Sequence, residues 1–179
     1  PTITFDKDEL NSINALKKHR YAIINIDPAA YYPNSRRVFG LDILNLASEI
    51  KSAHNMNVYE IGIHNQHGLP RIIIENERDL MVFIEASTLF IGLDSFCLHI
   101  AASLNKPQVC FFGGVNPEYR LFKNSNQVII QKPCEKQHCY HNHLHVGDSI
   151  DCDLKLKQPK CSITTNQEVM SAIKSLNIG

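Results

Sequence analysis

Short apolar runs alternate with segments of helical periodicity along this chain, and that alternation constrains the fold more than any other feature. The run at 21–26 is long enough for a buried strand and too short for a helix. The stretch at 38–53 repeats apolar residues every three or four positions, as an amphipathic helix requires. Strand–helix–strand units of this length favour a parallel sheet covered by helices on both faces. We therefore predict an α/β fold with a Rossmann-like parallel sheet, in a single domain over residues 1–179.

The same patterns place the individual elements. The predicted strands are 21–26, 58–63, 89–92, 108–112 and 128–130, with 71–74 as a shorter candidate. The predicted helices are 6–18, 38–53, 77–87, 96–104 and a closing helix at 164–177. Pro28 and Pro33 indicate a loop after the first strand. Ligands of parallel sheets bind beyond the carboxyl ends of the strands, so the segments to search are 27–37, 63–67, 93–99 and 113–120.

Composition excludes several classes of function. Lys plus Arg and Asp plus Glu each total 18, which argues against broad binding to nucleic acid or an anionic membrane. No apolar run reaches the roughly 18 residues of a transmembrane helix, and no secretory signal is visible. We therefore expect a cytoplasmic protein without a transmembrane segment. The chain begins with Pro1 rather than Met, and we expect it to be part of a longer protein.

The segment 89–122 has the most informative pattern. Its apolar strand is followed at once by Asp94 and Ser95, and a helix then carries His99. The N–H groups and positive dipole end of a helix N-terminus suit a phosphate, and a serine hydroxyl there can cap the helix or donate to a phosphate oxygen. Asp94 can accept hydrogen bonds from sugar hydroxyls. Taken alone, the same residues also fit an ordinary helix cap followed by a half-buried histidine.

In its order and spacing this segment resembles the donor-site signature of the heptosyltransferase family, glycosyltransferase family 9. The matching residues are Asp94-Ser95, His99, Ala101-Ala102, Lys106-Pro107, Phe112-Gly113 and Asn116-Pro117-Glu118. The resemblance implies the donor-binding C-terminal half of a two-domain (GT-B) glycosyltransferase of the ADP-heptose type, which acts in lipopolysaccharide biosynthesis. It assigns Asp94 to the donor sugar. It assigns Ser95, the Phe96 N–H and His99 to the diphosphate, and it places Gly113 and Asn116 beside the donor.

The family's catalytic base lies in the other, N-terminal domain of the chain. The resemblance therefore implies no catalytic residue here, and we expect this chain alone to bind a nucleotide-sugar without transferring the sugar. A glycan, lipid or protein acceptor would complete the reaction, in the cytoplasm or at the inner face of the inner membrane. Two features depart from the family pattern. Phe96 stands where the family has glycine, and Gly114-Val115-Asn116 replaces Pro-Thr-Asp.

A pair of arginines upstream supplies a candidate for binding the diphosphate. Arg36 and Arg37 follow the first strand and its loop, and the family has a Lys or Arg at a similar place. A guanidinium there would form charge-assisted hydrogen bonds with phosphate oxygens. Cations at the start of a helix oppose the helix dipole, which favours a role in anion binding over a merely solvated pair.

The segment 134–161 is polar, lacks periodicity and contains four of the six cysteines. These are Cys134, Cys139, Cys152 and Cys161. Four thiolates can bind zinc or iron tetrahedrally, and a loop this long needs a constraint to stay ordered. We expect a structural metal that ties the closing helix to the sheet without affecting the chemistry. Free thiols and disulfides formed on oxidation are the alternatives. We expect the histidines of this loop, at positions 138, 141, 143 and 145, to be solvated, although one could replace a cysteine as ligand.

Two other functions remain open. One is a degenerate, non-catalytic relative that serves as an interaction module, for which Phe96 and the altered Gly113–Asn116 loop are the reasons. The other is a different α/β enzyme that binds a nucleotide-sugar at a similar edge of its sheet, such as an epimerase. A sheet order unlike that of glycosyltransferases would favour the epimerase.

Overall fold

A parallel sheet forms the centre of the molecule. The computed structural model describes residues 2–26, 34–62, 67–121, 126–142, 152–176 and 178. The sheet has five strands in the order β2-β1-β3-β4-β5, and each neighbouring pair is parallel. The strands are β1 (Tyr21–Asn25), β2 (Asn57–Glu60), β3 (Leu89–Leu93), β4 (Gln108–Phe111) and β5 (Gln127–Ile130). The predicted α/β class and the parallel sheet are confirmed.

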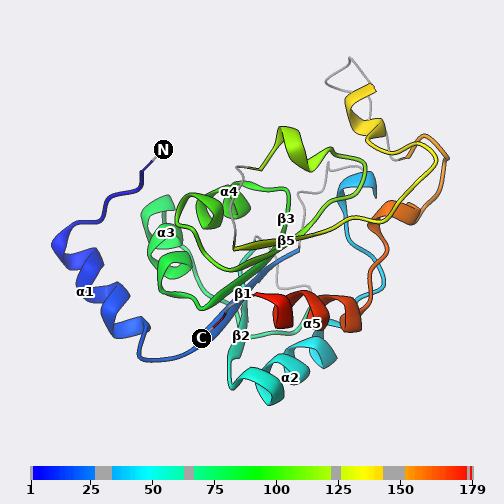
Figure 1. The fold of residues 1–179 in the computed structure, drawn as a ribbon. Helices are drawn as coiled ribbons and strands as arrows, with labels where there is room; N and C mark the ends of the chain where they lie inside the picture. The colour runs from blue at the N-terminus through cyan, green and yellow to red at the C-terminus, as the bar shows by residue number, and fades with distance from the viewer. Residues whose placement is uncertain are drawn as a thin grey trace.

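Helices cover both faces of this sheet (Figure 1). On one side lie α3 (Glu77–Ala86) and α4 (Phe96–Ser103), with α1 (Lys7–Leu16) packed against α3. On the other side lie α2 (Ile43–His54) and α5 (Asn166–Ser175). Four 3-10 turns complete the described elements: η1 (Asn34–Arg36), η2 (Pro117–Tyr119), η3 (Cys139–Asn142) and η4 (Lys160–Ser162). None of the helices in the described part of the chain has the length and apolar character to cross a membrane.

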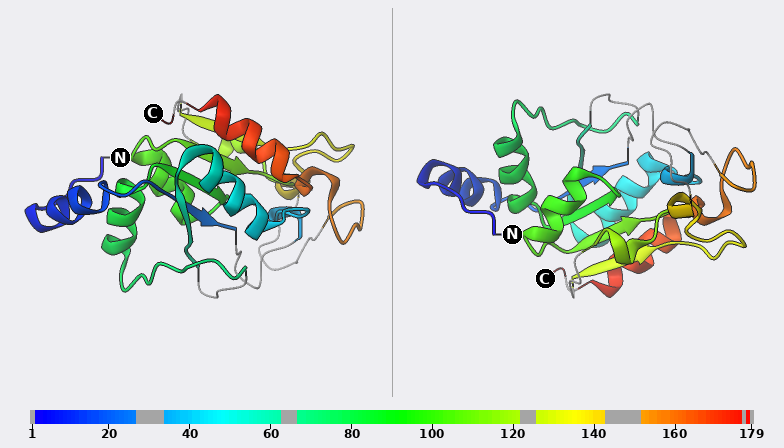
Figure 2. Two further views of the ribbon diagram at one scale, coloured as in Figure 1. Left: turned by 90° about the horizontal axis from the view of Figure 1, so that it is seen from below. Right: turned by 90° about the horizontal axis from the view of Figure 1, so that it is seen from above.

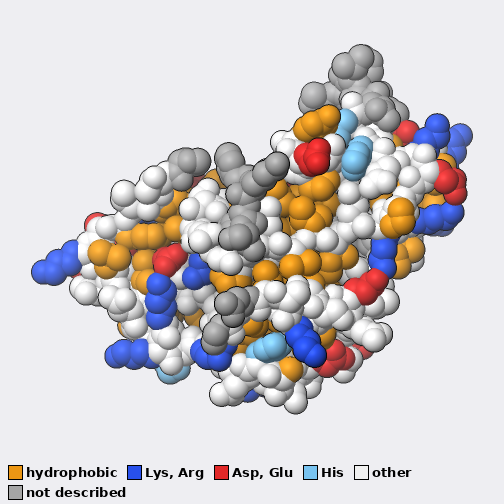
Figure 3. Space-filling view, viewed as in Figure 1, with side chains coloured by type: hydrophobic (Ala, Val, Ile, Leu, Met, Phe, Trp, Pro, Cys, Tyr) orange, Lys and Arg blue, Asp and Glu red, His pale blue; other side chains and the backbone are white. Residues whose placement is uncertain are grey.

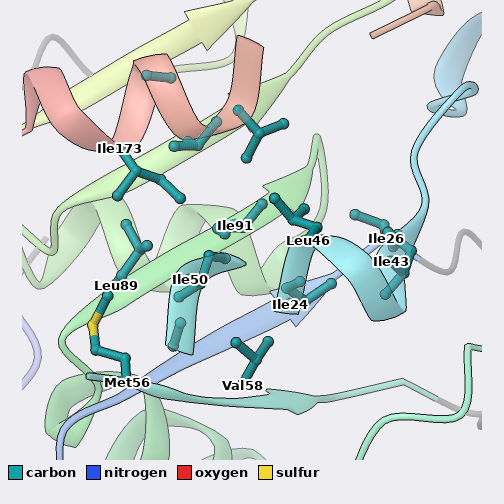
Figure 4. Close-up of a cluster of buried hydrophobic side chains, with 14 of the residues drawn as sticks. Ile24, Ile26, Ile43, Leu46, Ile50, Met56, Val58, Leu89, Ile91 and Ile173 are labelled. Atoms are coloured by element: carbon teal, nitrogen blue, oxygen red, sulfur yellow. The ribbon is translucent and has the colours of Figure 1, made fainter. Parts of the chain in front are cut away.

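The two faces of the sheet bury separate apolar clusters. Figure 4 shows the cluster under α2 and α5, where Ile24 of β1 and Ile91 of β3 meet Leu46 of α2. The opposite cluster joins Ile23 and Phe90 to residues of α1, α3 and α4. All five residues of β1 and of β3 are buried, as expected for central strands that are covered on both sides.

Several element boundaries differ from the prediction by a few residues, and two differences have a clear physical cause. The second helix begins at Ile43 rather than at 38, because Gly40 has a φ of 87° and Asp42 forms the N-cap. The candidate strand at 71–74 is wrong, since only Arg71 forms an isolated bridge, to Glu60. Pro70 has no N–H to extend that pairing. The predicted loop at Pro28 and Pro33 falls outside the described residues.

The direction of the strand order reverses between β1 and β3. The chain leaves β1 toward β2 on one side and returns to β3 on the other, and ligands of open α/β sheets bind at such a switch point. Figure 2 shows η1 and the described parts of the 134–161 loop at the same end of the molecule, where these strands end. The carboxyl ends of β1 and β3 are therefore the place to look for a site.

Candidate functional site

Polar side chains join the ends of β1 and β3 at the switch point. Asn25 is the last residue of β1 and is 8% exposed. The hydroxyl of Ser95 donates to its Oδ1 at 3.0 Å, and its Nδ2 donates to the Ile61 carbonyl at 2.9 Å. Sequence reasoning missed Asn25, although an amide within an apolar strand was the available signal. Asn25 fixes the loop that leads from β3 into α4.

The N-terminus of α4 opens at this point. Ser95 is its N-cap, and Oγ accepts from the Leu98 N–H at 3.4 Å. The first turn of a helix presents N–H groups and a positive partial charge, which suit an anion. The Phe96 side chain follows the cap and is 58% exposed. Its ring therefore lies mostly in solvent rather than in the core.

Asp94 immediately precedes this cap and is surrounded by cationic groups. Its Oδ2 lies 2.8 Å from Arg36 Nη2 and 4.0 Å from Arg120 Nε. Its Oδ1 lies 3.5 Å from His99 Nε2. Arg36 Nη2 also donates to the Asp94 carbonyl at 3.0 Å. The predicted residues Asp94, Ser95, His99 and Arg36 are thus brought together, while Arg120 was missed even though it lies within the predicted segment 113–120.

The electrostatics of this cluster favour an ionised Asp94. Burial raises the pKa of a carboxyl, and the Asp94 side chain is only 7% exposed. The hydrogen bond from His99 and the charges of Arg36 and Arg120 outweigh burial, so the pKa of Asp94 falls below its ordinary value. The site therefore holds a fixed, buried acceptor beside a helix N-terminus.

The two arginines of the predicted pair have different surroundings. Arg36 faces Asp94, whereas Arg37 lines a small cavity with Ser162 and Ile163 near α5. The turn that carries Arg36 is held by a close backbone approach, because the Gly114 N–H donates to the Ser35 carbonyl at 2.7 Å.

Gly113 permits this approach between backbones. A Cβ at position 113 would lie 2.0 Å from the Ser35 carbonyl oxygen and 2.3 Å from Ser162 Oγ. Gly113 therefore acts through packing against η1 in this structure. Asn116 also has an internal role, since its Oδ1 accepts from the Glu118 N–H at 3.0 Å and caps η2.

The cysteine loop contributes to this site. The Tyr140 N–H donates to the Gly114 carbonyl at 3.1 Å, and the Arg36 guanidinium lies 5.3 Å from the centre of the Tyr140 ring. His141 Nε2 accepts from the Asn116 N–H at 2.8 Å. The expectation of a solvated histidine is wrong for His141, because the loop folds back onto the β4 end. The predicted histidines at 143 and 145 fall outside the described residues.

The four loop cysteines are free thiols close enough to affect one another's ionisation. Cys139 and Cys161 are buried. Burial, followed by the charges of the other three thiols, raises the pKa of Cys161 to about 11 despite a hydrogen bond with Ser162. Cys134 and Cys152 also raise the pKa of Cys139, after the larger effect of burial. Among the described residues, no three Cys, His, Asp or Glu side chains have the spacing of a formed metal site.

The two described ends of the cysteine loop lie close together. The Lys132 N–H, just after β5, donates to the Cys161 carbonyl at 3.3 Å. Lys132 also pairs with Glu168 of α5. The loop therefore connects the end of β5 to the last helix.

Charge on the surface agrees with the balanced composition. On the face drawn in Figure 3, cationic and anionic side chains are interspersed, and neither sign forms a continuous patch. The paired charges at Asp94 are instead a local, largely buried arrangement. This pattern fits a pocket for one small anionic ligand better than a polyanion surface.

A parallel sheet with a helix N-terminus and a cationic cluster at its switch point defines a Rossmann-like domain. Residues 76–147 match the family model of glycosyltransferase family 9 (heptosyltransferase). The resemblance inferred from the sequence is thereby confirmed. Comparison with curated proteins finds no significant match.

Solved structures of heptosyltransferases share the fold. ADP-heptose LPS heptosyltransferase II of E. coli is 17% identical with a TM-score of 0.64, and the match covers 98% of this chain and 53% of that one. A family 9 glycosyltransferase from Veillonella parvula is 14% identical with a TM-score of 0.62, covering 97% and 52%. The iron-containing dodecameric glycosyltransferase TibC of enterotoxigenic E. coli is 17% identical with a TM-score of 0.66, covering 87% and 44%. The chain thus spans about half the length of these proteins.

Proposed function

We propose that residues 1–179 form the nucleotide-sugar-binding domain of a bacterial glycosyltransferase, with a donor of the ADP-heptose type. The observation that carries the proposal is the convergence of Arg36, His99 and Arg120 on Asp94, directly before the N-terminus of α4. A helix N-terminus and guanidinium groups suit a diphosphate, and a buried ionised carboxylate suits sugar hydroxyls. A structure of TibC in complex with ADP-D-β-D-heptose has the same fold, with a TM-score of 0.68.

Within this pocket each residue has a separate role. Asp94 accepts from the donor sugar, while Ser95, the Phe96 N–H and His99 bind the diphosphate. Arg36 both fixes Asp94 and supplies positive charge to the phosphates, and Gly113 and Asn116 shape the wall that follows β4. A second domain supplies the catalytic base, so the chain binds the donor without transferring it. The acceptor is a glycan, lipid or protein, and the reaction takes place in the cytoplasm.

Calorimetry tests donor binding directly. ADP-heptose, ADP and UDP are titrated into the wild type, Asp94→Ala and the control Asp8→Ala, whose site is an exposed position on α1. We expect the wild type and the control to bind one of these ligands and Asp94→Ala to lose most of the affinity for the sugar nucleotide. Absence of binding by the wild type would refute the proposal and would favour a non-catalytic interaction module.

We also propose that Cys134, Cys139, Cys152 and Cys161 hold a structural zinc or iron ion. A cation would stabilise thiolates that otherwise raise one another's pKa, and four sulfur ligands suit tetrahedral zinc or iron. TibC, which shares the fold, is an iron-containing protein.

Elemental analysis of protein purified under reducing conditions tests the metal site. We expect one bound ion in the wild type and in the control Cys97→Ser, and loss of the ion in Cys139→Ser. Chelation should lower the melting temperature of the wild type. Wild-type protein free of metal would defeat this proposal.

A further inference from the structure

Two aromatic residues of the cysteine loop lie beside the residues that surround Asp94. Tyr140 and His141 follow Cys139 directly and lie in η3. Tyr140 is anchored through its backbone, since its N–H donates to the Gly114 carbonyl at 3.1 Å. Its ring faces the Arg36 guanidinium at 5.3 Å, within the range of a cation–π interaction. Arg36 is therefore held from two sides, by the Tyr140 ring and by the Asp94 carboxylate.

His141 contacts the segment that follows β4. Its Nε2 accepts from the Asn116 N–H at 2.8 Å. Its ring meets the rings of Tyr119 and Tyr140 edge to face, with centroids 5.1 Å and 5.7 Å away. Asn116 caps η2, and that turn leads directly to Arg120. The position of Arg120 beside Asp94 thus depends on a backbone segment that His141 holds.

We propose that Tyr140 and His141 are positioning residues of the donor pocket. Tyr140 holds the Arg36 guanidinium beside Asp94, and His141 holds the turn that carries Arg120. Long cationic side chains lose conformational freedom when they bind a phosphate, and side chains fixed in advance bind with less loss. This inference rests on the proposed function, because the pocket being shaped is the nucleotide-sugar pocket.

The cysteine loop also packs against the backbone next to Arg36. Cys139 is buried, and its Sγ would lie 3.0 Å from a Cβ at position 114, so it packs against the same glycine that receives the Tyr140 N–H. Order at Cys139 is therefore transmitted to Tyr140 and Arg36. The cysteine loop therefore contacts residues that we propose to bind the donor, in addition to joining the end of β5 to α5.

Matched variants separate positioning from general stability. ADP and UDP are titrated into the wild type, Tyr140→Leu, Tyr140→Phe and the loop control Glu135→Gln. A cation–π contact of this kind predicts roughly three- to tenfold weaker nucleotide binding in Tyr140→Leu. Tyr140→Phe keeps the aromatic face and should bind like the wild type, as should Glu135→Gln, whose carboxylate is exposed and pairs with Lys160.

Amide hydrogen exchange supplies a readout that needs no ligand. His141→Ala should speed exchange of the Asn116 amide and weaken nucleotide binding, while the amides of β1 and β3 keep their protection. Nucleotide affinity unchanged in both Tyr140→Leu and His141→Ala, together with loss of ADP-heptose affinity in Asp94→Ala, would overturn this inference and leave the proposed function intact. A wild type that binds neither nucleotide would overturn both.

Discussion

Replacing Arg36 with methionine should lower the free energy of unfolding, because the buried Asp94 carboxylate loses its nearest cationic partner. Methionine keeps much of the apolar stem and removes only the guanidinium, whose Nη2 lies 2.8 Å from Asp94 Oδ2. The Asp94 side chain is 7% exposed and that of Arg36 is 12% exposed, so solvent cannot replace the lost partner fully. Removing one member of a buried ion pair costs about 3–5 kcal/mol.

Two groups remain near Asp94 and reduce this cost. His99 and Arg120 lie 3.5 Å and 4.0 Å from its oxygens and still compensate part of its charge. We therefore expect Arg36→Met to lose about 2–3 kcal/mol of stability at neutral pH. The loss should depend on pH. In the wild type the pKa of Asp94 is depressed, so its contribution is present above the unfolded pKa of about 3.9 and is lost as pH falls through the lower folded pKa. Without Arg36 the folded pKa rises, and the deficit should shrink as Asp94 becomes protonated.

Urea unfolding of Arg36→Met at neutral pH and at about pH 4 measures both effects. The control is Arg37→Met, which removes the neighbouring guanidinium beside Ser162 and Ile163. A double-mutant cycle with Asp94→Asn isolates the coupling between the two side chains. A loss below about 0.5 kcal/mol for Arg36→Met, or an equal loss at both pH values, would refute the electrostatic account.

Two further predictions concern packing. Gly113→Ala should cost about 2–3 kcal/mol in urea unfolding and also weaken nucleotide binding, because its Cβ would displace the Ser35 carbonyl next to Arg36; an alanine variant of full stability would contradict the close approach. Glu60→Leu should instead stabilise the protein by about 1–3 kcal/mol, since Glu60 is 0% exposed, neither carboxylate oxygen has a hydrogen-bond partner among the described residues, and His67 Nε2 lies as far as 3.9 Å from Oε1. A lower melting temperature for Glu60→Leu would show that the carboxylate serves the fold.

The sequence predicted the elements well because local periodicity determines them. Strands buried on both faces read as continuous apolar runs, and β1 and β3 have that pattern. The start of α2 was placed too early because apolar spacing continues through Val38 and Leu41, whereas Gly40 and Asp42 set the real boundary. The cluster of Asp94, Ser95 and His99 was predictable from one short motif.

The positions of Arg36, Arg120 and His141 depend on contacts between distant parts of the chain, which local sequence patterns do not indicate. The choice of Arg36 over Arg37 follows from the orientation of η1, which the backbone of Gly113 and Gly114 determines. Asn116 and His141 are 25 positions apart, and the loop between β5 and η4 has no periodicity that would indicate which side chain faces the sheet. Arg120 lay in a predicted segment, but nothing local marked it as a partner of Asp94.

The place of α5 in the core has a consequence for how the chain folds during synthesis. Val169 and Ile173 of α5 are fully buried against the sheet beside α2, yet they follow the whole cysteine loop in sequence. Until α5 has left the ribosome, part of this apolar cluster stays exposed to solvent, including Leu46 and Ile50 of α2. Nascent chains that expose apolar sheet surface for this long are prone to aggregate and to engage chaperones. The core under α2 can therefore close only after the whole cysteine loop has been synthesised.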